Sequence, residues 1–255
     1  MQRVSKIKTA LKAIAILKNW PIYFANYFKL TKKQYIFFKL KNGIVFKIRS
    51  KTNDRVIFNQ IWLTKTYIPR GFEIKENDVI FDVGAHIGLF SILAGALAKK
   101  GKVYSFEPSL DNFNLLKENV ELNKARNIEL INKAVAGNSG MRGFALSPDD
   151  PAGHAIPYDE TDRKKINVPT VSLDDFIREN NIKEIDFLKM DCEGAEYEIF
   201  FNCNQETLMK INKISMEYHD VDSERIVARI KEFLEKFGFG VFLQTVGDNM
   251  LYAKR

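Results

Sequence analysis

The stretch "VIFDVGAHIGLFSILAG", residues 79–95, predicts a strand, a tight turn and a helix in direct succession. It starts with an apolar run, places the acid Asp82 near the end of the strand, and turns through Gly84 and Gly88 into apolar residues at helical spacing. Similar apolar runs follow at 102–108, 128–137, 185–194 and 213–219, and helical patterns at 109–124, 173–180 and 195–202 separate them. This alternation is typical of a mostly parallel sheet covered by helices.

The end of the chain predicts an antiparallel closure of that sheet. A helical segment stops at Gly238, and the apolar runs "FGVFLQT" and "NMLYAKR" follow it, joined through Gly247 and Asp248. Two such runs around a Gly-Asp turn predict a hairpin, whose last strand runs against the others. We therefore expect an α/β, Rossmann-like fold, mostly parallel, with an antiparallel last strand.

Residues 1–70 form what we call the N-terminal annex. It contains a helical pattern at 3–18, two β-rich runs at 35–50 around Asn42 and Gly43, and a second helical pattern at 54–69. The main domain is then expected to span residues 71–255. It carries a long insert near 138–170, predicted to be irregular and either a lid or disordered, with short strands at its two ends.

Charge is distributed unevenly between these two parts. Residues 1–70 hold 16 Lys and Arg against one acid, Asp54, so the rest of this chain of net charge +7 is acidic. The basic annex predicts a surface directed at an anionic partner, and the alternative is a solvated lysine-rich exterior.

The first helical pattern places Val4, Ile7, Leu11 and Ile14 on one side of a helix. Charged residues interrupt it well before the ~20 residues that a membrane span needs. Residues 1–30 are expected either to lie on an anionic membrane surface or to pack against the protein itself or a partner.

Only two cysteines occur, Cys192 and Cys203, which are too few for a disulfide framework. No cluster of Cys and His indicates a structural zinc site. So few cysteines are typical of a protein in a reducing compartment. We therefore expect a cytoplasmic protein, with peripheral contact at the inner membrane face as the alternative.

Acidic residues stand at four predicted strand ends, namely Asp82, Glu107, Asp191 and Glu217, and His219 follows the last of them. Ligands of open parallel sheets bind beyond the carboxyl ends of the strands, where these side chains should gather. Each acid alone is as easily explained as a helix cap.

The turn at 84–88 distinguishes between two nucleoside cofactors. It lacks the G-x-G-x-x-G spacing of a dinucleotide site, and Asp82 would repel a diphosphate. S-adenosylmethionine has no phosphate and carries positive charge, so an acid beside the loop suits it. Glu107, at the end of the next strand, is expected to accept hydrogen bonds from the ribose hydroxyls.

Four stretches, "DVGAHIGLFS", "SFEPSLDNFNLLKENVELN", "TVSLDDF" and "IDFLKMDCEGAEYEIF", resemble the FkbM-type S-adenosylmethionine-dependent methyltransferases over residues 35–219. The resemblance implies a seven-stranded sheet and O-methylation of a hydroxyl, often on a sugar or glycoconjugate. Members of that family more often carry asparagine where His86 stands.

These observations assign candidate roles to residues. The candidate catalytic residues are Asp191, His219 and Glu217, with His219 as the preferred general base because its ordinary pKa is near neutral. The cofactor-binding candidates are Asp82, Gly84, Ala85, His86, Gly88, Glu107, Lys133 and Ala134. His154, in the insert, is a candidate contact to the acceptor, and no metal is expected.

Two alternatives stay open at this point. One is a nicotinamide-dependent oxidoreductase on a similar sheet, and the other is a noncatalytic protein that binds a membrane or a partner. The acceptor is expected to be a small molecule or a glycan, including a lipid-linked one, whereas carboxylates at the site suit a nucleic acid badly. The oligomeric state is left open.

Overall fold

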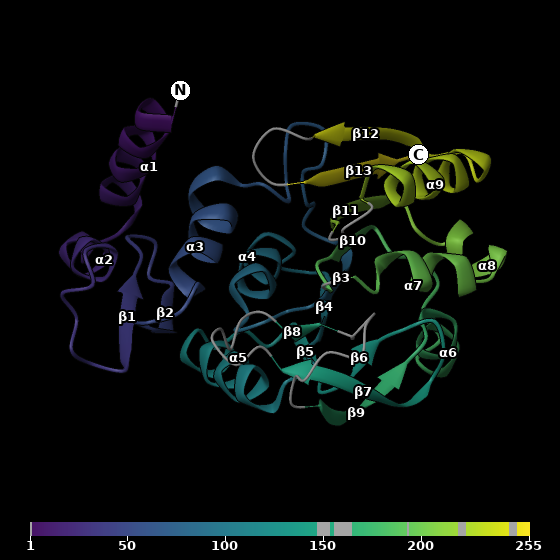
Figure 1. Ribbon diagram of the computed structural model, residues 1–255, viewed down its shortest axis with the longest axis horizontal. Coiled ribbons are helices and arrows are strands. Elements are labelled where there is room, and N and C mark those ends of the chain that lie inside the picture. Colours follow the sequence, from purple (N-terminus) through teal and green to yellow (C-terminus); the bar gives the residue numbers. More distant parts are fainter. Residues whose placement is uncertain (1, 147–153, 156–164, 193, 219–222, 245–248) are drawn as a thin grey trace.

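A sheet of seven strands forms the centre of the computed structural model, which describes residues 2–146, 154–155, 165–192, 194–218, 223–244 and 249–255 (Figure 1). In spatial order the strands are β12 (Gly240–Gln244), β13 (Met250–Lys254), β11 (Lys213–Glu217), β10 (Phe187–Met190), β3 (Val79–Val83), β4 (Lys102–Phe106) and β5 (Ile128–Ile131). β13 pairs antiparallel with both of its neighbours, and the other pairs are parallel. The predicted seven-stranded sheet with an antiparallel last strand is confirmed.

The strand register brings the ends of β3, β4 and β10 to one edge. Asp82 of β3 lies opposite Lys189 of β10 on one side and Ser105 of β4 on the other. Because these strands run in the same direction, the residues that follow them lie next to one another at the carboxyl edge. This edge is where the predicted site residues should meet.

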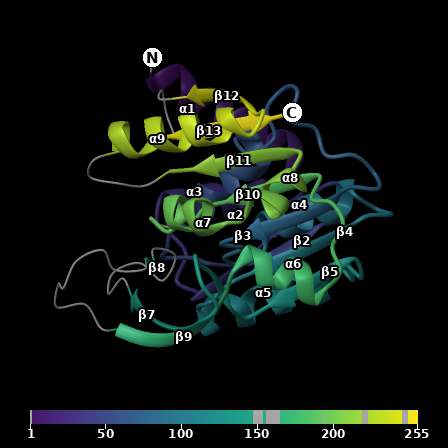
Figure 2. The ribbon, with the colours of Figure 1, turned by 90° about the vertical axis from the view of Figure 1, so that its right-hand side faces the viewer.

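Helices cover both faces of the sheet, as the two ribbon views show (Figures 1 and 2). They are α4 (Leu89–Leu97), α5 (Leu110–Leu122), α6 (Leu173–Glu179), α7 (Glu196–Asn202), α8 (Gln205–Met209) and α9 (Ser223–Lys236). Successive residues of β3 serve different cores: Ile80 packs in the core that contains Phe90 of α4, and Phe81 in the core that contains Phe176 of α6. Strand geometry requires this alternation when both faces are buried.

The N-terminal annex joins the first of these cores. It consists of α1 (Gln2–Ile16), α2 (Trp20–Tyr27), β1 (Tyr35–Lys39), β2 (Val45–Arg49), α3 (Asp54–Phe58) and the π-helix η1 (Asn59–Thr64). The predicted hairpin is confirmed by the antiparallel pairing of β1 with β2. The helix expected over 54–69 ends earlier, at Thr64, because Lys65 takes a left-handed conformation with φ 57°. Phe38 and Phe46 of the hairpin lie in one core with Phe90.

The insert contributes a second, smaller sheet. Its strands, in the order β6-β9-β7-β8, are β6 (Ala134–Val135), β9 (Lys165–Val171), β7 (Gly140–Leu146) and β8 (His154–Ala155). The two short strands expected at its ends are therefore confirmed, and they pair antiparallel with each other. Within the insert, His154 and Ala155 form a further short strand that pairs antiparallel with β7, and residues 147–153 and 156–164 lie outside the described residues. Figure 2 shows this sheet beside the main one.

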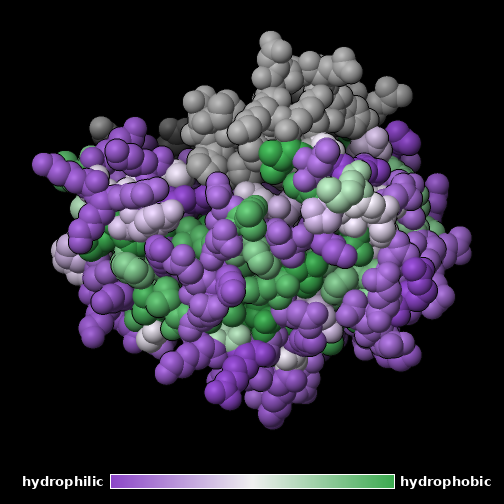
Figure 3. All heavy atoms as spheres, turned by 90° about the horizontal axis from the view of Figure 1, so that it is seen from below, coloured by the Kyte–Doolittle hydropathy of each residue, from purple (hydrophilic) through white to green (hydrophobic). Residues whose placement is uncertain are grey.

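The surface mixes polar and apolar residues. Seen from below, hydrophobic residues are visible in the middle of a largely hydrophilic face (Figure 3). No helix in the described part of the chain combines the length and the hydrophobicity needed to cross a membrane.

Candidate active site

The turn after β3 brings the ends of two strands into direct contact. Gly84 has φ 75°, and a Cβ placed on it would lie 1.8 Å from the carbonyl oxygen of Asp191. Only glycine fits this approach. The backbone N–H groups of Gly84 and Ala85 donate to the carbonyl of Phe106 at the end of β4. Gly88, with φ 85°, lets α4 begin against Leu116.

Asp82 is fully buried and is engaged by two side chains of the protein itself. The hydroxyl of Ser91 donates to its Oδ2 at 2.6 Å, and Nζ of Lys189 lies 3.2 Å from its Oδ1. Nζ of Lys189 also donates to the carbonyl of Gly84 at 2.7 Å. Burial lowers the pKa of Lys189, but the carboxylates of Asp82 and Asp191 outweigh this effect and raise it above its usual value. Lys189 is therefore a buried cation at the base of the site.

Tyr67 connects Asp191 and Glu217. Its hydroxyl lies 2.8 Å from Oδ2 of Asp191 and 2.9 Å from Oε2 of Glu217, and its ring is buried against Phe90 of α4. The ammonium group of Lys189 is 3.9 Å from the same oxygen of Asp191. Burial, followed by the two carboxylates, raises the pKa of Tyr67 well above its ordinary value. Tyr67 thus stays protonated at neutral pH.

Tyr67 lies between two acceptors. A phenol carries a single hydrogen, so Tyr67 can donate fully to only one of the two carboxyl groups at a time. The ammonium group of Lys189 lies beside Asp191. The side chain of Asp191 is 25% exposed, whereas that of Lys189 is 3% exposed.

Glu107 is a buried carboxylate held by backbone groups. Its oxygens accept hydrogen bonds from the N–H of His86 at 2.8 Å and of Ser109 at 2.9 Å. Burial raises its pKa from 4.5 to about 7, although these backbone donors and Asn112 act in the opposite direction. Each carboxylate oxygen can accept more than one hydrogen bond. Glu107 can therefore also accept hydrogen bonds from the hydroxyl groups of a ligand.

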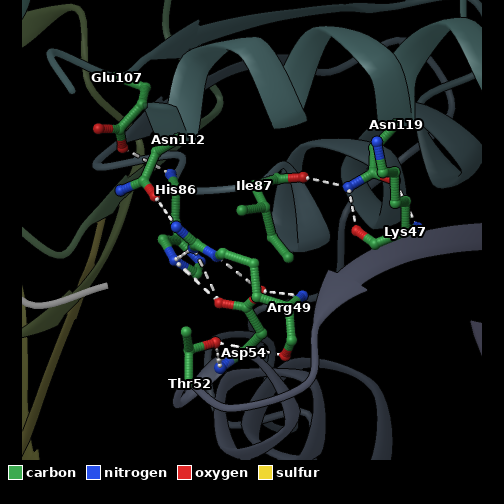
Figure 4. Close-up of polar contacts among 9 residues, drawn as sticks. All are labelled: Lys47, Arg49, Thr52, Asp54, His86, Ile87, Glu107, Asn112 and Asn119. Carbon is green, nitrogen blue, oxygen red and sulfur yellow. Dashed lines mark hydrogen bonds and ion pairs between the residues drawn. The ribbon is translucent and has the colours of Figure 1, made fainter. Parts of the chain in front are cut away.

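His86 joins the turn to the annex, as Figure 4 shows. Its Nε2 lies 2.7 Å from a guanidinium nitrogen of Arg49, which also forms an ion pair with the buried Asp54 at 2.9 Å. Arginine only donates, so Nε2 accepts and the ring hydrogen sits on Nδ1. Among the described residues this buried Nδ1 has no hydrogen-bond partner. Burial lowers the pKa of His86 to about 4, which keeps the ring neutral.

A second link between annex and turn runs through Asn119 of α5. Its amide donates to the carbonyls of Lys47 in β2 and of Ile87 in the turn, and its oxygen accepts from the N–H of Lys47 (Figure 4). The hairpin of the annex therefore holds the turn from outside the main sheet.

The remaining candidates are placed as follows. Lys133 is exposed, and Ala134 is buried at the start of β6. The backbone of His154 lies in β8, opposite Leu146 of β7. His219 lies outside the described residues. No group of three or more His, Cys, Asp or Glu that could hold a metal ion occurs in the part of the chain that the structure describes.

Sequence reasoning missed three residues of this arrangement. Lys189 had a visible signal, because it is the one charge in the apolar strand "FLKM". Tyr67 and Arg49 gave none, since both come from the annex and reach the site only through the tertiary fold.

Comparison with known proteins identifies the family. The family described as "Methyltransferase FkbM domain" matches residues 82–241. The 31-O-demethyl-FK506 methyltransferase FkbM of Streptomyces tacrolimicus is 25% identical over 232 residues, which cover 80% of this chain and 88% of that protein. The hexuronic acid methyltransferase AglP of Haloferax volcanii is 27% identical over 162 residues, covering 63% and 64%. The 2-O-methyltransferase NoeI of Sinorhizobium fredii is 28% identical over 162 residues, covering 57% and 65%.

Among solved structures, M. jannaschii TYW2 in complex with AdoMet aligns with 88% of this chain and 86% of its own, at a TM-score of 0.49 and 16% identity. The match to the family covers more than half of the chain and decides against the oxidoreductase and noncatalytic alternatives. The chain belongs to the FkbM methyltransferase family and is an S-adenosylmethionine-dependent enzyme.

Proposed function

We propose that this methyltransferase acts on a hydroxyl group of a sugar or glycoconjugate. The observation that carries the proposal is the group formed by Asp191, Tyr67 and Glu217 at the carboxyl edge of the sheet. A hydroxyl must lose its proton as it is methylated, and an ionised carboxylate at the edge of this group can receive it. The names of two relatives, a hexuronic acid methyltransferase and a 2-O-methyltransferase, support a sugar acceptor.

The turn and the end of β4 fit the cofactor. Glu107 offers acceptors for the two ribose hydroxyls, and the buried Nδ1–H of His86, without a partner among the described residues, offers a donor nearby. The backbone of Gly84, Ala85 and Gly88 shapes the turn that would hold the nucleoside. When bound, S-adenosylmethionine supplies the electrophilic methyl group.

Asp82 acts on the site through Lys189 rather than by direct contact. Its carboxylate positions the ammonium group of Lys189. That ammonium group lies 3.9 Å from Asp191 and donates a hydrogen bond to the carbonyl of Gly84. This arrangement holds a positive charge beside the carboxyl group of Asp191. We place Lys133 and Ala134 next to the adenine, because they follow β5, which pairs with β4, the strand that ends just before Glu107.

Asp191 is the group that we assign to receive the proton. Asp191 and Glu217 are both partly exposed, but only for Asp191 does the structure give contacts with both Tyr67 and the ammonium group of Lys189. Glu217 accepts from the same hydroxyl of Tyr67 and is a positioning residue in this scheme. His219 remains the alternative base, and His154 remains a proposed contact to the acceptor from the second sheet.

Labelled cofactor tests the proposed acceptor class. The purified protein is incubated with methyl-labelled S-adenosylmethionine and a cell extract, which is then separated into lipids, polysaccharides, proteins and RNA. We expect the label in the polysaccharide or lipid-linked fraction, with the Asp191→Asn variant as the control that labels far more slowly. Label only in protein or RNA would contradict the acceptor class.

Treatment of the labelled product with mild alkali tests the acceptor atom. A methyl ether on a hydroxyl withstands this treatment, whereas a methyl ester on a carboxyl group releases labelled methanol. Release of most of the label would exclude a hydroxyl acceptor.

A further inference from the structure

The outward face of α1 is apolar. Ile7 and Leu11 are each 61% exposed and Ile14 is 39% exposed, and their spacing of four and three residues places them on one stripe. The opposite side packs on η1, where Ala13 is buried and Nζ of Lys12 donates to the carbonyl of Leu63. A surface helix normally turns its apolar stripe toward the core. Here the stripe faces away from it.

The apolar surface continues beyond α1. Trp20, Ile22 and Tyr27 of α2 are between 37% and 42% exposed, and Phe28 and Leu30, which follow α2, are 63% and 71% exposed. In Figure 1 both helices lie at one end of the molecule, beside the hairpin and away from the strands of the main sheet. We call this surface, made of the exposed apolar residues of 7–30, the annex face. Exposed apolar residues that gather at one end of a molecule indicate an interaction site.

Lysines accompany the apolar residues of the annex face. Lys6 and Lys8 are exposed neighbours of Ile7 and lie about 100° to either side of it on the helix. Lys18, Lys29, Lys32 and Lys33 are exposed as well. Residues 6–33, which include the annex face, contain seven Lys and not one Asp or Glu. The partner must therefore be both apolar and anionic.

These features discriminate between partners. A second copy of the chain would bring two cationic faces together with no opposite charge to pair. A nucleic acid would satisfy the lysines but leave the apolar stripe exposed to water. An anionic bilayer satisfies both, because aliphatic and aromatic side chains enter the acyl boundary while lysines reach the headgroups. We propose that the annex face docks on an anionic phospholipid membrane surface.

Vesicle sedimentation with the 255-residue chain tests this docking. We expect binding to vesicles of phosphatidylcholine with 30% phosphatidylglycerol, weaker binding to phosphatidylcholine alone, and loss of binding as salt rises. Replacing Ile7 and Leu11 by Gln should lower the partition coefficient about tenfold or more, since it removes two buried aliphatic groups. The matched control replaces Met209 and Phe242 by Gln. These two residues lie outside the annex and are 59% and 56% exposed, so the control should bind vesicles like the unmodified chain.

Other outcomes would overturn the proposal. Equal vesicle binding by the Ile7 and Leu11 variant would exclude the stripe as the contact. A dimer in solution that this variant abolishes, without vesicle binding, would identify a second copy as the partner. Binding to RNA but not to vesicles would identify a nucleic acid. Because both replaced residues are exposed, thermal unfolding of the variant should match that of the control, and this result separates docking from folding.

Discussion

Replacing Glu107 by Gln should remove a pH dependence from the stability of the protein. The carboxyl group has a pKa of about 7 in the folded chain against an ordinary value of 4.5, because burial disfavours its charged form. A folded pKa above the unfolded one stabilises the fold fully below about pH 4.5. That stabilisation is lost as the pH rises through 7.

The size of the effect follows from the shift. The shift from 4.5 to about 7 corresponds to roughly 3 kcal/mol of unfolding free energy. Most of it, about 2 to 3 kcal/mol, is lost between pH 5 and pH 8. The Gln variant carries no charge at this position and escapes the loss. At acid pH it still differs from Glu107, because its amide can accept from only one of the two backbone donors at once.

Urea unfolding without cofactor, at pH values from 5 to 8, measures the effect. The difference in unfolding free energy between the Gln variant and the unmodified chain should shift in favour of the variant by about 2 to 3 kcal/mol as the pH rises. Taking the difference cancels contributions from other titrating groups. The control is Glu121→Gln, an exposed acid on α5, whose difference should stay constant. A constant difference for the Glu107 variant as well would refute the reasoning.

The same buried charges and rings give further expectations. Lys189→Met should lower the free energy of unfolding by about 3 to 5 kcal/mol, because it leaves the buried charge of Asp82 without its ion-pair partner. In urea unfolding, the double variant with Asp82→Asn should regain much of this loss. Additive losses in the two single variants would contradict the pairing. NMR titration of the three histidines should give His86 a pKa of about 4. Because this pKa lies below the ordinary 6.5, the stability that the neutral ring contributes is lost as the pH falls from 6.5 toward 4. A pKa near 6.5 would contradict the buried, neutral state of His86. His219→Ala separates the two candidate bases: with Asp191 as the base, the rate of methyl transfer should stay near that of the unmodified chain, whereas a loss of a hundredfold or more at unchanged binding of S-adenosylhomocysteine would assign the proton to His219.

The sequence predicted the main sheet well because each of its strands and helices is specified by residues that are neighbours in the sequence. Apolar runs and helical spacing specify each strand and helix, and parallel strands bring residues such as Asp82 and Asp191 to one edge whatever their distance along the chain. The insert was predicted less well. A long segment with several prolines and glycines separates β7 from β9 in the sequence. The sequence pattern therefore predicted that the two strands exist but not that they pair with each other in a second sheet.

The chemistry of the edge could be predicted only in part. An acid at a strand end is visible in a sequence, but its partner is not when that partner comes from another part of the chain. Tyr67 precedes Asp191 by 124 residues and lies in a segment without any motif. Arg49 reaches His86 in the same way, from the hairpin. The expectation of an acid facing a cationic cofactor at Asp82 also overlooked Lys189, which lies opposite it in the register.

The rate of methyl transfer by the Asp191→Asn variant, at saturating S-adenosylmethionine, tests the central claim most directly. Asparagine keeps the shape of the side chain and can still accept from Tyr67, but it cannot take up a proton. We predict a rate at least a hundredfold below that of the unmodified chain, with binding of S-adenosylhomocysteine within threefold. An Asp191→Asn enzyme that turns over at the unmodified rate would contradict the assignment.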